Sequence, residues 1–290
     1  MNFAPDKDAL RQVSAALESD LKSAGVEEAG LTAMYLLSHV LGCRRLEVGL
    51  RAQDVLADAQ AHELNRLAAR MKAGEPLQYV LGDVEFLGRL FKTDPRALIA
   101  RPETELLVEW ALASSDVWAR SGPRVVDVGT GTGCIAVSLA LERPAARIMA
   151  VDLSAEALAL ARENARSLGV EARMAFYRAD LLASFAPGSL DAVVSNPPYI
   201  ASEECARLPR HIREHEPRLA LDGGSDGLFT ISRLVEQAAF TLKSGGRLYM
   251  EIGEEQASPV RRLLAEAGFV QVEIRKDWNG HDRMAGGLKP

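Results

Sequence analysis

The 290-residue sequence contains little cysteine, and its few cysteines lie far apart. Cys43, Cys134 and Cys205 show no paired spacing, which suggests neither a disulfide framework nor a thiolate metal site. One pair of histidines, His211 and His215, has the spacing of two ligands on one helix face, but no third ligand accompanies the pair. We therefore expect no metal site.

An excess of positive charge and a long apolar run are also absent. The formal net charge is -6, whereas proteins that grip nucleic acid through its phosphates usually carry a basic domain or stripe. No apolar run approaches the roughly 20 residues that cross a bilayer, and Met1 to Asp8 carries no basic, apolar leader. These features predict a soluble, cytoplasmic protein that binds neither membrane nor nucleic acid. We further expect it to be a monomer.

Apolar residues make up 48% of the chain, which is enough for buried cores, and the length suits two domains. In the first part, apolar residues recur at helical spacing over residues 6–24, 27–41 and 56–72, with a short helical turn between the last two. This part contains no glycine-rich loop and no cluster of convergent polar groups. It is either a partner-binding module or a structural cap.

The sequence pattern changes after Gly74. Two short extended runs, Val84–Leu87 and Leu90–Lys92, flank Gly88-Arg89 and predict a hairpin, which a loop through Arg101-Pro102 follows. We therefore divide the chain into a helical domain (residues 1–77), a hairpin linker (residues 78–102) and a third region (residues 103–290).

In residues 103–290, helical stretches alternate with short β-branched runs, which is typical of a parallel sheet with helices on both faces. The expected strands are Arg124–Val128, Arg147–Val151, Arg173–Tyr177, Asp191–Ser195, Arg247–Ile252, Val270–Arg275 and Arg283–Leu288. The last strand returns as a hairpin partner. The predicted fold class is α/β, a doubly wound, mostly parallel seven-stranded sheet with a smaller all-helical amino-terminal domain. Ligands of such sheets bind at the carboxyl ends of the strands.

The first expected strand runs into a glycine-rich loop, Asp127-Val128-Gly129-Thr130-Gly131-Thr132-Gly133. Glycines permit positive φ and close approach of a ligand, and the helix that follows offers free N–H groups at its start. The dinucleotide-binding fingerprint would place its third glycine where Cys134 stands, which disfavours a nicotinamide cofactor. Asp127 suits the ammonium group of an amino-acid moiety and would repel a phosphate. The alternative is a tight strand-to-helix turn without a ligand.

Two further acidic residues end the next expected strands. Asp152 ends the second strand, where a carboxylate can accept hydrogen bonds from ribose hydroxyls. An isolated Asp at this place is often only a helix cap, and Ser154 could also cap the next helix, but the preceding glycine loop favours ribose binding. Asp180-Leu181 follows the third strand and is placed to meet an adenine amino group and pack on its ring. Together these positions predict a cofactor that contains an amino acid, a ribose and an adenine.

The fourth expected strand ends in Asn196-Pro197-Pro198-Tyr199. The two prolines fix φ, remove two backbone donors and favour extended conformations before them. Asn196 Oδ1 and the Pro197 carbonyl can then both accept hydrogen bonds from one NH₂ group, while Tyr199 gives that planar group a flat surface. A turn without function could also contain two prolines. The position at the carboxyl end of a strand, near the glycine loop, favours a binding site.

Such a loop suits methyl transfer from S-adenosylmethionine to an amide-type nitrogen. This nitrogen is a poor nucleophile because its lone pair is delocalised, so position must supply much of the rate, and orientation can reach effective molarities of about 10⁵ to 10⁸ M. Two acceptors hold both N–H bonds and aim the nitrogen at the methyl group. The face of Tyr199 can assist near a sulfonium, and no general base is predicted.

The sequence resembles a known family, the bacterial peptide-chain release factor N(5)-glutamine methyltransferases, called PrmC or HemK. Besides the two loops, the resemblance rests on three segments: Gly74-Glu75-Pro76-Leu77-Gln78-Tyr79, Arg101-Pro102-Glu103-Thr104-Glu105 and Glu216-Pro217-Arg218-Leu219-Ala220-Leu221. The resemblance covers nearly the whole chain.

The resemblance implies a helical amino-terminal domain that binds a release factor and a catalytic domain that methylates the glutamine of its Gly-Gly-Gln motif. S-adenosylmethionine would be converted to S-adenosylhomocysteine. The residues implied to contact this cofactor are Gly129 to Gly133, Asp152, Asp180-Leu181 and Asn196, with Arg101-Pro102 lining the pocket. Asn196 to Tyr199 would hold the glutamine amide. Leu181 departs from the pattern, because some members carry a bulky aromatic residue there.

Three alternatives remain at this stage. Adenine-N6 methyltransferases of DNA or RNA share an Asn-Pro-Pro-aromatic loop, but the acidic charge argues against them. A sister family methylates a glutamine of a ribosomal protein, and the Arg101 to Glu105 segment looks more like that of the release-factor enzymes. A cofactor-binding scaffold without activity would not need Asn196 and two prolines beside a glycine loop.

Overall fold

In the computed structural model of the protein, residues 8–290 are described. They pack as two compact units. Unit 1 contains the chain up to Gly82 together with Arg210–His215, and unit 2 contains Asp83–Pro209 and Glu216–Pro290. The predicted division at residues 77 and 102 stays a prediction.

Unit 1 is helical. Its helices are α1 (Leu10–Ser23), α2 (Ala29–Leu41), α3 (Arg45–Leu50), α4 (Asp58–Lys72), α5 (Leu77–Leu81) and α11 (Arg210–His215). The amphipathic spacing forms the core, since α1 buries Leu10, Val13, Leu17 and Leu21. The three predicted helices and the helical turn between the last two are present. The part of the first predicted helix at residues 6 and 7, and most of the segment Met1 to Asp8, lie outside the described residues.

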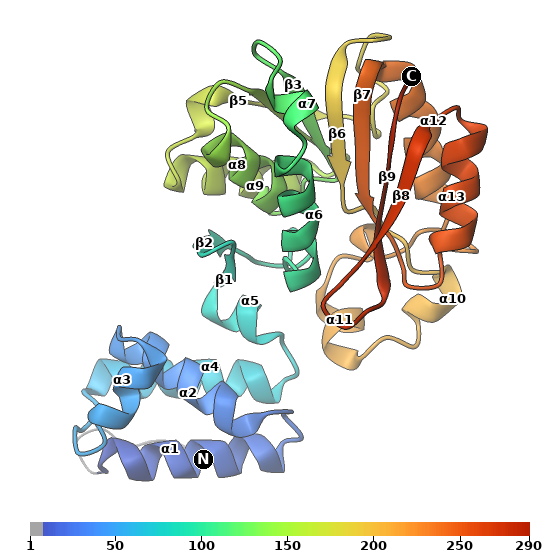
Figure 1. The fold of residues 1–290 in the computed structure, drawn as a ribbon. Helices are drawn as coiled ribbons and strands as arrows, with labels where there is room; N and C mark the ends of the chain where they lie inside the picture. Colours follow the sequence, from blue (N-terminus) through green and yellow to red (C-terminus); the bar gives the residue numbers. More distant parts are fainter. Residues whose placement is uncertain (1–7) are drawn as a thin grey trace. The chain divides into compact units, whose positions relative to one another are not determined.

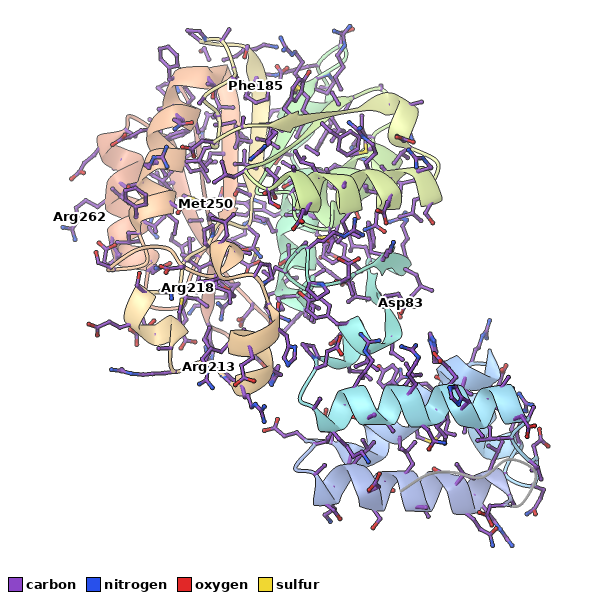
Figure 2. All side chains as sticks on the ribbon, turned by 180° about the vertical axis from the view of Figure 1, so that it is seen from behind. Asp83, Phe185, Arg213, Arg218, Met250 and Arg262 are labelled. Atoms are coloured by element: carbon purple, nitrogen blue, oxygen red, sulfur yellow. The ribbon has the colours of Figure 1, made fainter. Side chains whose placement is uncertain are left out.

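Unit 2 begins with a small hairpin at Asp83, which Figure 2 labels. Its strands are β1 (Asp83–Phe86) and β2 (Arg89–Lys92). The turn consists of Leu87 and Gly88, whose φ values are 49° and 69°. The prediction of a Gly88-Arg89 turn was therefore wrong by one residue, because a two-residue hairpin turn of this kind needs positive φ at both central positions.

A seven-stranded sheet forms the centre of unit 2 (Figure 1). Its strands are β3 (Arg124–Val128), β4 (Arg147–Asp152), β5 (Met174–Arg178), β6 (Leu190–Ser195), β7 (Leu242–Glu251), β8 (Val270–Lys276) and β9 (Asp282–Leu288). Their order is β5-β4-β3-β6-β7-β9-β8, and only the pairings of β9 are antiparallel. The predicted fold class is confirmed.

Helices cover both faces of this sheet, because successive strand residues point to opposite sides. Val125 of β3 and Ile148 of β4 belong to one core, and Val126 and Met149 belong to the other. Met250, labelled in Figure 2, lies fully buried in this second core. The helices and 3₁₀ turns of unit 2 are α6 (Pro102–Leu112), α7 (Ser115–Trp118), α8 (Cys134–Glu142), α9 (Ala155–Ser167), η1 (Glu171–Arg173), α10 (Ser202–Cys205), η2 (Arg218–Ala220), α12 (Phe229–Thr241) and α13 (Ala257–Glu266).

The layers are visible in Figure 1. Helices α6 and α8 contribute to the first core, whereas α12 and α13 contribute to the second and lie along β7, β8 and β9. The chain leaves β3 for β4 on one side and later adds β6 on the other side. Such a reversal of strand order opens a crevice at the carboxyl ends of the strands, where ligands of doubly wound sheets bind.

Within residues 8–290, no helix is both long enough and apolar enough to cross a membrane.

Candidate functional site

The register of the two central strands brings the predicted loops together. β3 and β6 are parallel neighbours, and Val128 pairs with Ser195. The next residue on each strand therefore begins a loop at the same edge of the sheet. A Cβ atom placed on Gly129 would lie 3.8 Å from the backbone carbonyl oxygen of Asn196. The glycine loop and the Asn-Pro-Pro-Tyr loop thus start side by side.

A cavity of about 430 Å³ opens at this edge, which is within the usual range of small-ligand sites. Ten predicted site residues line it: Arg101, Gly129, Thr130, Gly131, Thr132, Asp152, Asp180, Leu181, Asn196 and Pro198. Five others do not line it: Pro102, Asp127, Gly133, Pro197 and Tyr199. Three residues of the second group, Asp127, Gly133 and Tyr199, make contacts that support the cavity wall.

The glycines of the first loop differ in what they permit. Gly129, Gly131 and Gly133 have φ values of 70°, 54° and 81°, which favour glycine at each position. A Cβ atom on Gly133 would lie 2.9 Å from the Cβ atom of Ala161 in α9. Gly133 therefore lets the start of α8 pack against α9, while Gly129 and Gly131 line the cavity.

Asp127 is fully buried beneath the glycine loop. Its Oδ2 atom accepts hydrogen bonds from the Thr130 hydroxyl at 2.6 Å and the Ala136 N–H at 3.1 Å. Its Oδ1 atom is buried and accepts none within residues 8–290. Burial raises the pKa of Asp127 to about 7. In this structure Asp127 braces the loop, and its predicted role toward an ammonium group stays a prediction.

Asp152 lies at the end of β4 and faces the cavity. Its Oδ2 atom accepts a hydrogen bond from Gly131 N–H at 3.0 Å, and Oδ1 accepts one from Ser154 N–H at 2.9 Å. The side chain of Ser154, and not that of Asp152, caps α9, because its oxygen accepts from Ala157 N–H. Burial raises the pKa of Asp152. The carboxylate ties two loops together and keeps lone pairs for ligand hydroxyls.

Asp180 and Leu181 form the adjoining part of the wall, since the N–H of Ala179 donates to the Asp152 carbonyl at 3.1 Å. Asp180 Oδ2 accepts a hydrogen bond from Arg233 at 2.7 Å. Leu181 adopts a φ of 51°, a left-handed conformation that is uncommon for a residue with a Cβ atom. Residues held in such conformations cluster at ligand sites. This strain marks Leu181 as a position that the surrounding fold constrains.

A chain of hydrogen bonds supports the Asn-Pro-Pro-Tyr loop. The Asn196 Nδ2 group donates to Thr104 Oγ1 at 3.1 Å, and the Thr104 hydroxyl donates to Glu251 Oε2 at 2.7 Å. The Tyr199 hydroxyl donates to the other oxygen of Glu251 at 3.1 Å. Burial raises the pKa of both Glu251 and Tyr199. Sequence reasoning missed Thr104, although it lies in a segment that carried the family resemblance, and it missed Glu251, which lies in no quoted motif.

A second support of this loop comes from Gln256 at the start of α13 and from the glycines between η2 and α12. The Gln256 Nε2 group donates to the Tyr199 carbonyl at 2.9 Å and to the Gly227 carbonyl at 3.2 Å. A Cβ atom on Gly223 would lie 2.7 Å from the Pro198 carbonyl oxygen, so only glycine permits this approach. Neither Gln256 nor these glycines carried a sequence signal that pointed to the site.

Glu216 begins a segment that was noticed in the sequence but received no role there. It is 5% exposed and accepts hydrogen bonds from Ile99 N–H at 3.2 Å and from Arg101 at 2.6 Å. Arg101, Pro217 and Leu219 line the cavity. Glu216 therefore joins two segments of the wall that are far apart in the sequence.

The described residues include no group of three or more histidine, cysteine or acidic side chains that could hold a metal ion. The chemistry of the cavity lining instead suits a nucleoside that carries an amino acid. A carboxylate, Asp152, suits hydroxyl groups, the glycine loop admits close contact, and most of the lining surface is apolar. The residues present thus fit S-adenosylmethionine.

Comparisons with known proteins agree with this geometry. The PrmC N-terminal domain matches residues 8–82, and the methyltransferase small domain matches residues 103–223. A release factor glutamine methyltransferase of Nitratidesulfovibrio vulgaris is 43% identical over 268 residues, which are 91% of this chain and 90% of that protein. The enzyme of the same name from Bordetella pertussis is 45% identical over 262 residues, 89% of this chain and 94% of that protein.

Among solved structures, the fold is similar to that of the T. thermophilus 16S rRNA N2 G1207 methyltransferase in complex with AdoMet and guanosine. The TM-score is 0.52 at 18% identity, over 72% of this chain and 50% of that one, and this likeness concerns the fold alone. The identity and coverage of the relatives decide the family. The chain belongs to the release factor glutamine methyltransferase family and is an S-adenosylmethionine-dependent methyltransferase.

Proposed function

We propose that this enzyme methylates the side-chain amide nitrogen of the glutamine in the Gly-Gly-Gln motif of peptide-chain release factors. The family and the names of the relatives support a release factor as substrate. One observation carries the chemistry. The Nδ2 group of Asn196 is engaged by Thr104, so its Oδ1 atom is left as an acceptor at the cavity.

The cofactor would be held by the residues that line the cavity. We assign Asp152 to the ribose hydroxyls, Asp180 and Leu181 to the adenine, and Gly129 to Thr132 to the part that carries the amino acid. Arg101 forms the adjoining wall. S-adenosylmethionine supplies an electrophilic methyl group on a positively charged sulfur. Most of the lining surface of the cavity is apolar, which strengthens the polar contacts made within it.

The substrate amide would be held by the Asn-Pro-Pro-Tyr loop. Within residues 8–290, neither Asn196 Oδ1 nor the Pro197 carbonyl accepts a hydrogen bond, so both are available to the two N–H bonds of one amide group. Pro197 and Pro198 offer no N–H that would compete. The ring of Tyr199, whose hydroxyl donates to Glu251, would flank the planar amide. Orientation by fixed acceptors is what a delocalised nitrogen needs.

The helical part of the chain would bind the body of the release factor. We assign this role to residues 1–77, with residues 78–102 as linker and residues 103–290 as catalytic domain. Two large apolar side chains support the assignment, because Leu46 and Leu50 on α3 are 92% and 87% exposed. Replacing both with serine should weaken binding of the whole release factor by about tenfold but preserve methylation of a short Gly-Gly-Gln peptide. Equal loss with both substrates would contradict a docking role.

We also infer that the enzyme works as a monomer in the cytoplasm, where translation ends, and that it does not bind nucleic acid. The net charge of -6 supports the last point.

The experiment that tests the function uses labelled S-adenosylmethionine. The enzyme is incubated separately with intact release factors, ribosomal proteins, DNA and RNA, and mass spectrometry then locates the label. We expect it on the glutamine of the Gly-Gly-Gln motif, and a release factor with asparagine at that position should stay unlabelled. Label on a ribosomal protein or on an adenine base would overturn the proposal.

A further inference from the structure

Glu251 is a buried carboxylate beside the site that the reaction itself does not use. It ends β7, is 1% exposed and does not line the cavity. Its two oxygens serve different parts of the fold, since one accepts from Thr104 on α6 and the other accepts from Tyr199 on the loop after β6. A buried carboxylate is costly unless it is hydrogen-bonded, so its position calls for a reason beyond packing.

The hydrogen bonds that connect Glu251 to the cavity through Thr104 and Asn196 have a fixed order of donors and acceptors. An ionised carboxylate only accepts hydrogen bonds, so the Thr104 hydroxyl must give its single proton to Glu251. The Thr104 oxygen is then an acceptor toward Asn196, and the Asn196 NH₂ group turns to it. The carbonyl oxygen of the same amide is left on the other side. Burial raises the pKa of Glu251, and the hydrogen bonds from Thr104 and Tyr199 together with the charge of Arg283 oppose this rise.

We propose that Glu251 is a positioning residue that sets the orientation of the Asn196 side-chain amide through Thr104. The inference rests on the proposed role of Asn196 as the acceptor for the substrate amide. In one orientation Asn196 presents a carbonyl oxygen to the N–H bonds of the substrate. In the reverse orientation it presents an NH₂ group, and two donors face each other.

A neutral side chain at position 251 no longer imposes this order of donors and acceptors on Thr104 and Asn196. Glutamine has the shape of glutamate, but its NH₂ end can donate to the Thr104 oxygen. The Thr104 hydroxyl is then free to donate to the Asn196 carbonyl, which turns the NH₂ group of Asn196 toward the cavity. Either end of such a glutamine can still bond the Tyr199 hydroxyl. Glu251→Gln therefore disturbs the path through Thr104 while it keeps the contact with Tyr199.

The test compares four variants, with turnover at saturating S-adenosylmethionine measured separately from cofactor affinity. Thr104→Val removes the hydroxyl at nearly equal volume, and we expect turnover to fall by about tenfold, as for the loss of one hydrogen bond. Thr104→Ser restores the hydroxyl and should recover turnover to within about threefold of the wild type. Glu251→Gln should lower turnover by about threefold, because one of its two orientations keeps the required direction.

The double variant Thr104→Val/Glu251→Gln tests whether Glu251 acts on Asn196 through Thr104 or supports the site independently of Thr104. Because both changes act on one path, its turnover should equal that of Thr104→Val, whereas independent effects would multiply to a loss of about 30-fold. The affinity for S-adenosylmethionine, measured by calorimetry, should stay within about twofold in all four variants.

Three results would overturn the inference: wild-type turnover in Thr104→Val, equally slow Thr104→Ser, or multiplied losses in the double variant. If Glu251→Gln does not fold, the valine and serine variants of Thr104 still decide the question. Failure of the proposed function is separate, since it would show as wild-type enzyme that leaves release factors unlabelled. The same variants would then be measured on whichever substrate the wild type labels.

Discussion

The two loops of the site are built by opposite means. The glycine loop, Gly129 to Gly133, frees its backbone for left-handed conformations and offers the backbone itself to a ligand. The Asn-Pro-Pro-Tyr loop, Asn196 to Tyr199, restricts its backbone and offers acceptors without competing donors. Both are nevertheless braced in the same way, by a threonine hydroxyl that donates to a buried carboxylate, Asp127 or Glu251.

This comparison separates two tasks. A loop that wraps a cofactor needs close approach, which side chains would block, so glycine suits it. A loop that orients a poor nucleophile needs fixed acceptors, so asparagine followed by prolines suits it. If this division is correct, changes in the first loop should affect cofactor affinity or stability, and changes in the second should affect turnover.

The largest effect is expected from Asn196→Ala. Loss of the acceptor should lower turnover by at least roughly 10²-fold while S-adenosylmethionine binding stays mostly intact, as for loss of a transition-state contact. Single-turnover rates and calorimetry measure the two quantities. Asn279→Ala, in the exposed turn between β8 and β9, is the control and should keep its turnover. If Asn196→Ala turned over at the wild-type rate, the proposed division of tasks between the two loops would be wrong.

Gly133→Ala tests the packing of the glycine loop. The new Cβ atom would meet Ala161 at 2.9 Å, and φ is 81°. Gly169→Ala is a matched control, since its φ is 74° and no atom lies within 4 Å of its Cβ position. Both should lose about 1 kcal/mol to backbone strain, and Gly133→Ala should lose about 1 to 3 kcal/mol more to overpacking. Urea denaturation measures both, and equal losses would show that the contact with Ala161 relaxes freely.

Asp152→Asn should separate affinity from turnover in the opposite sense to Asn196→Ala. Loss of the charge weakens hydrogen bonds to ligand hydroxyls, so the affinity for S-adenosylmethionine should fall by about tenfold. Turnover at saturating cofactor should change little. Calorimetry and initial rates give the two values. A fall in turnover with unchanged affinity would place Asp152 in the chemistry and not in cofactor binding.

The smallest effect is a pH dependence of stability that involves Asp127. Burial raises its folded-state pKa from 3.8 to about 7, so its contribution to stability is fully present below the unfolded pKa and is lost as pH rises through about 7. The free energy of unfolding of the protein without cofactor should therefore fall more steeply from about pH 4 to about pH 7 in the wild type than in Asp127→Asn. Parallel curves from urea denaturation would show that Asp127 stays ionised in the fold.

Much of the fold could be predicted because its signals are local. Alternation of β-branched runs and helices predicted all seven strands, because the period of apolar residues can be read within a short segment of the chain. The turn after β1 was predicted one residue too late. Both Leu87 and Gly88 adopt positive φ, but only glycine is recognisable from the sequence as a residue that favours this conformation.

The sequence by itself determined the two loops and the family, because glycines, prolines and Asn196 act through their own backbone or side chain within a few residues. Only the tertiary structure decided what holds them. Thr104 and Glu251 are 147 residues apart, and Tyr199 and Glu251 are 52 apart, yet each pair shares a hydrogen bond. A hydrogen bond depends on the distance and the direction between two groups in space. The order of strands in the sheet brings remote segments together, so the spacing of two residues along the chain does not show whether they form such a bond.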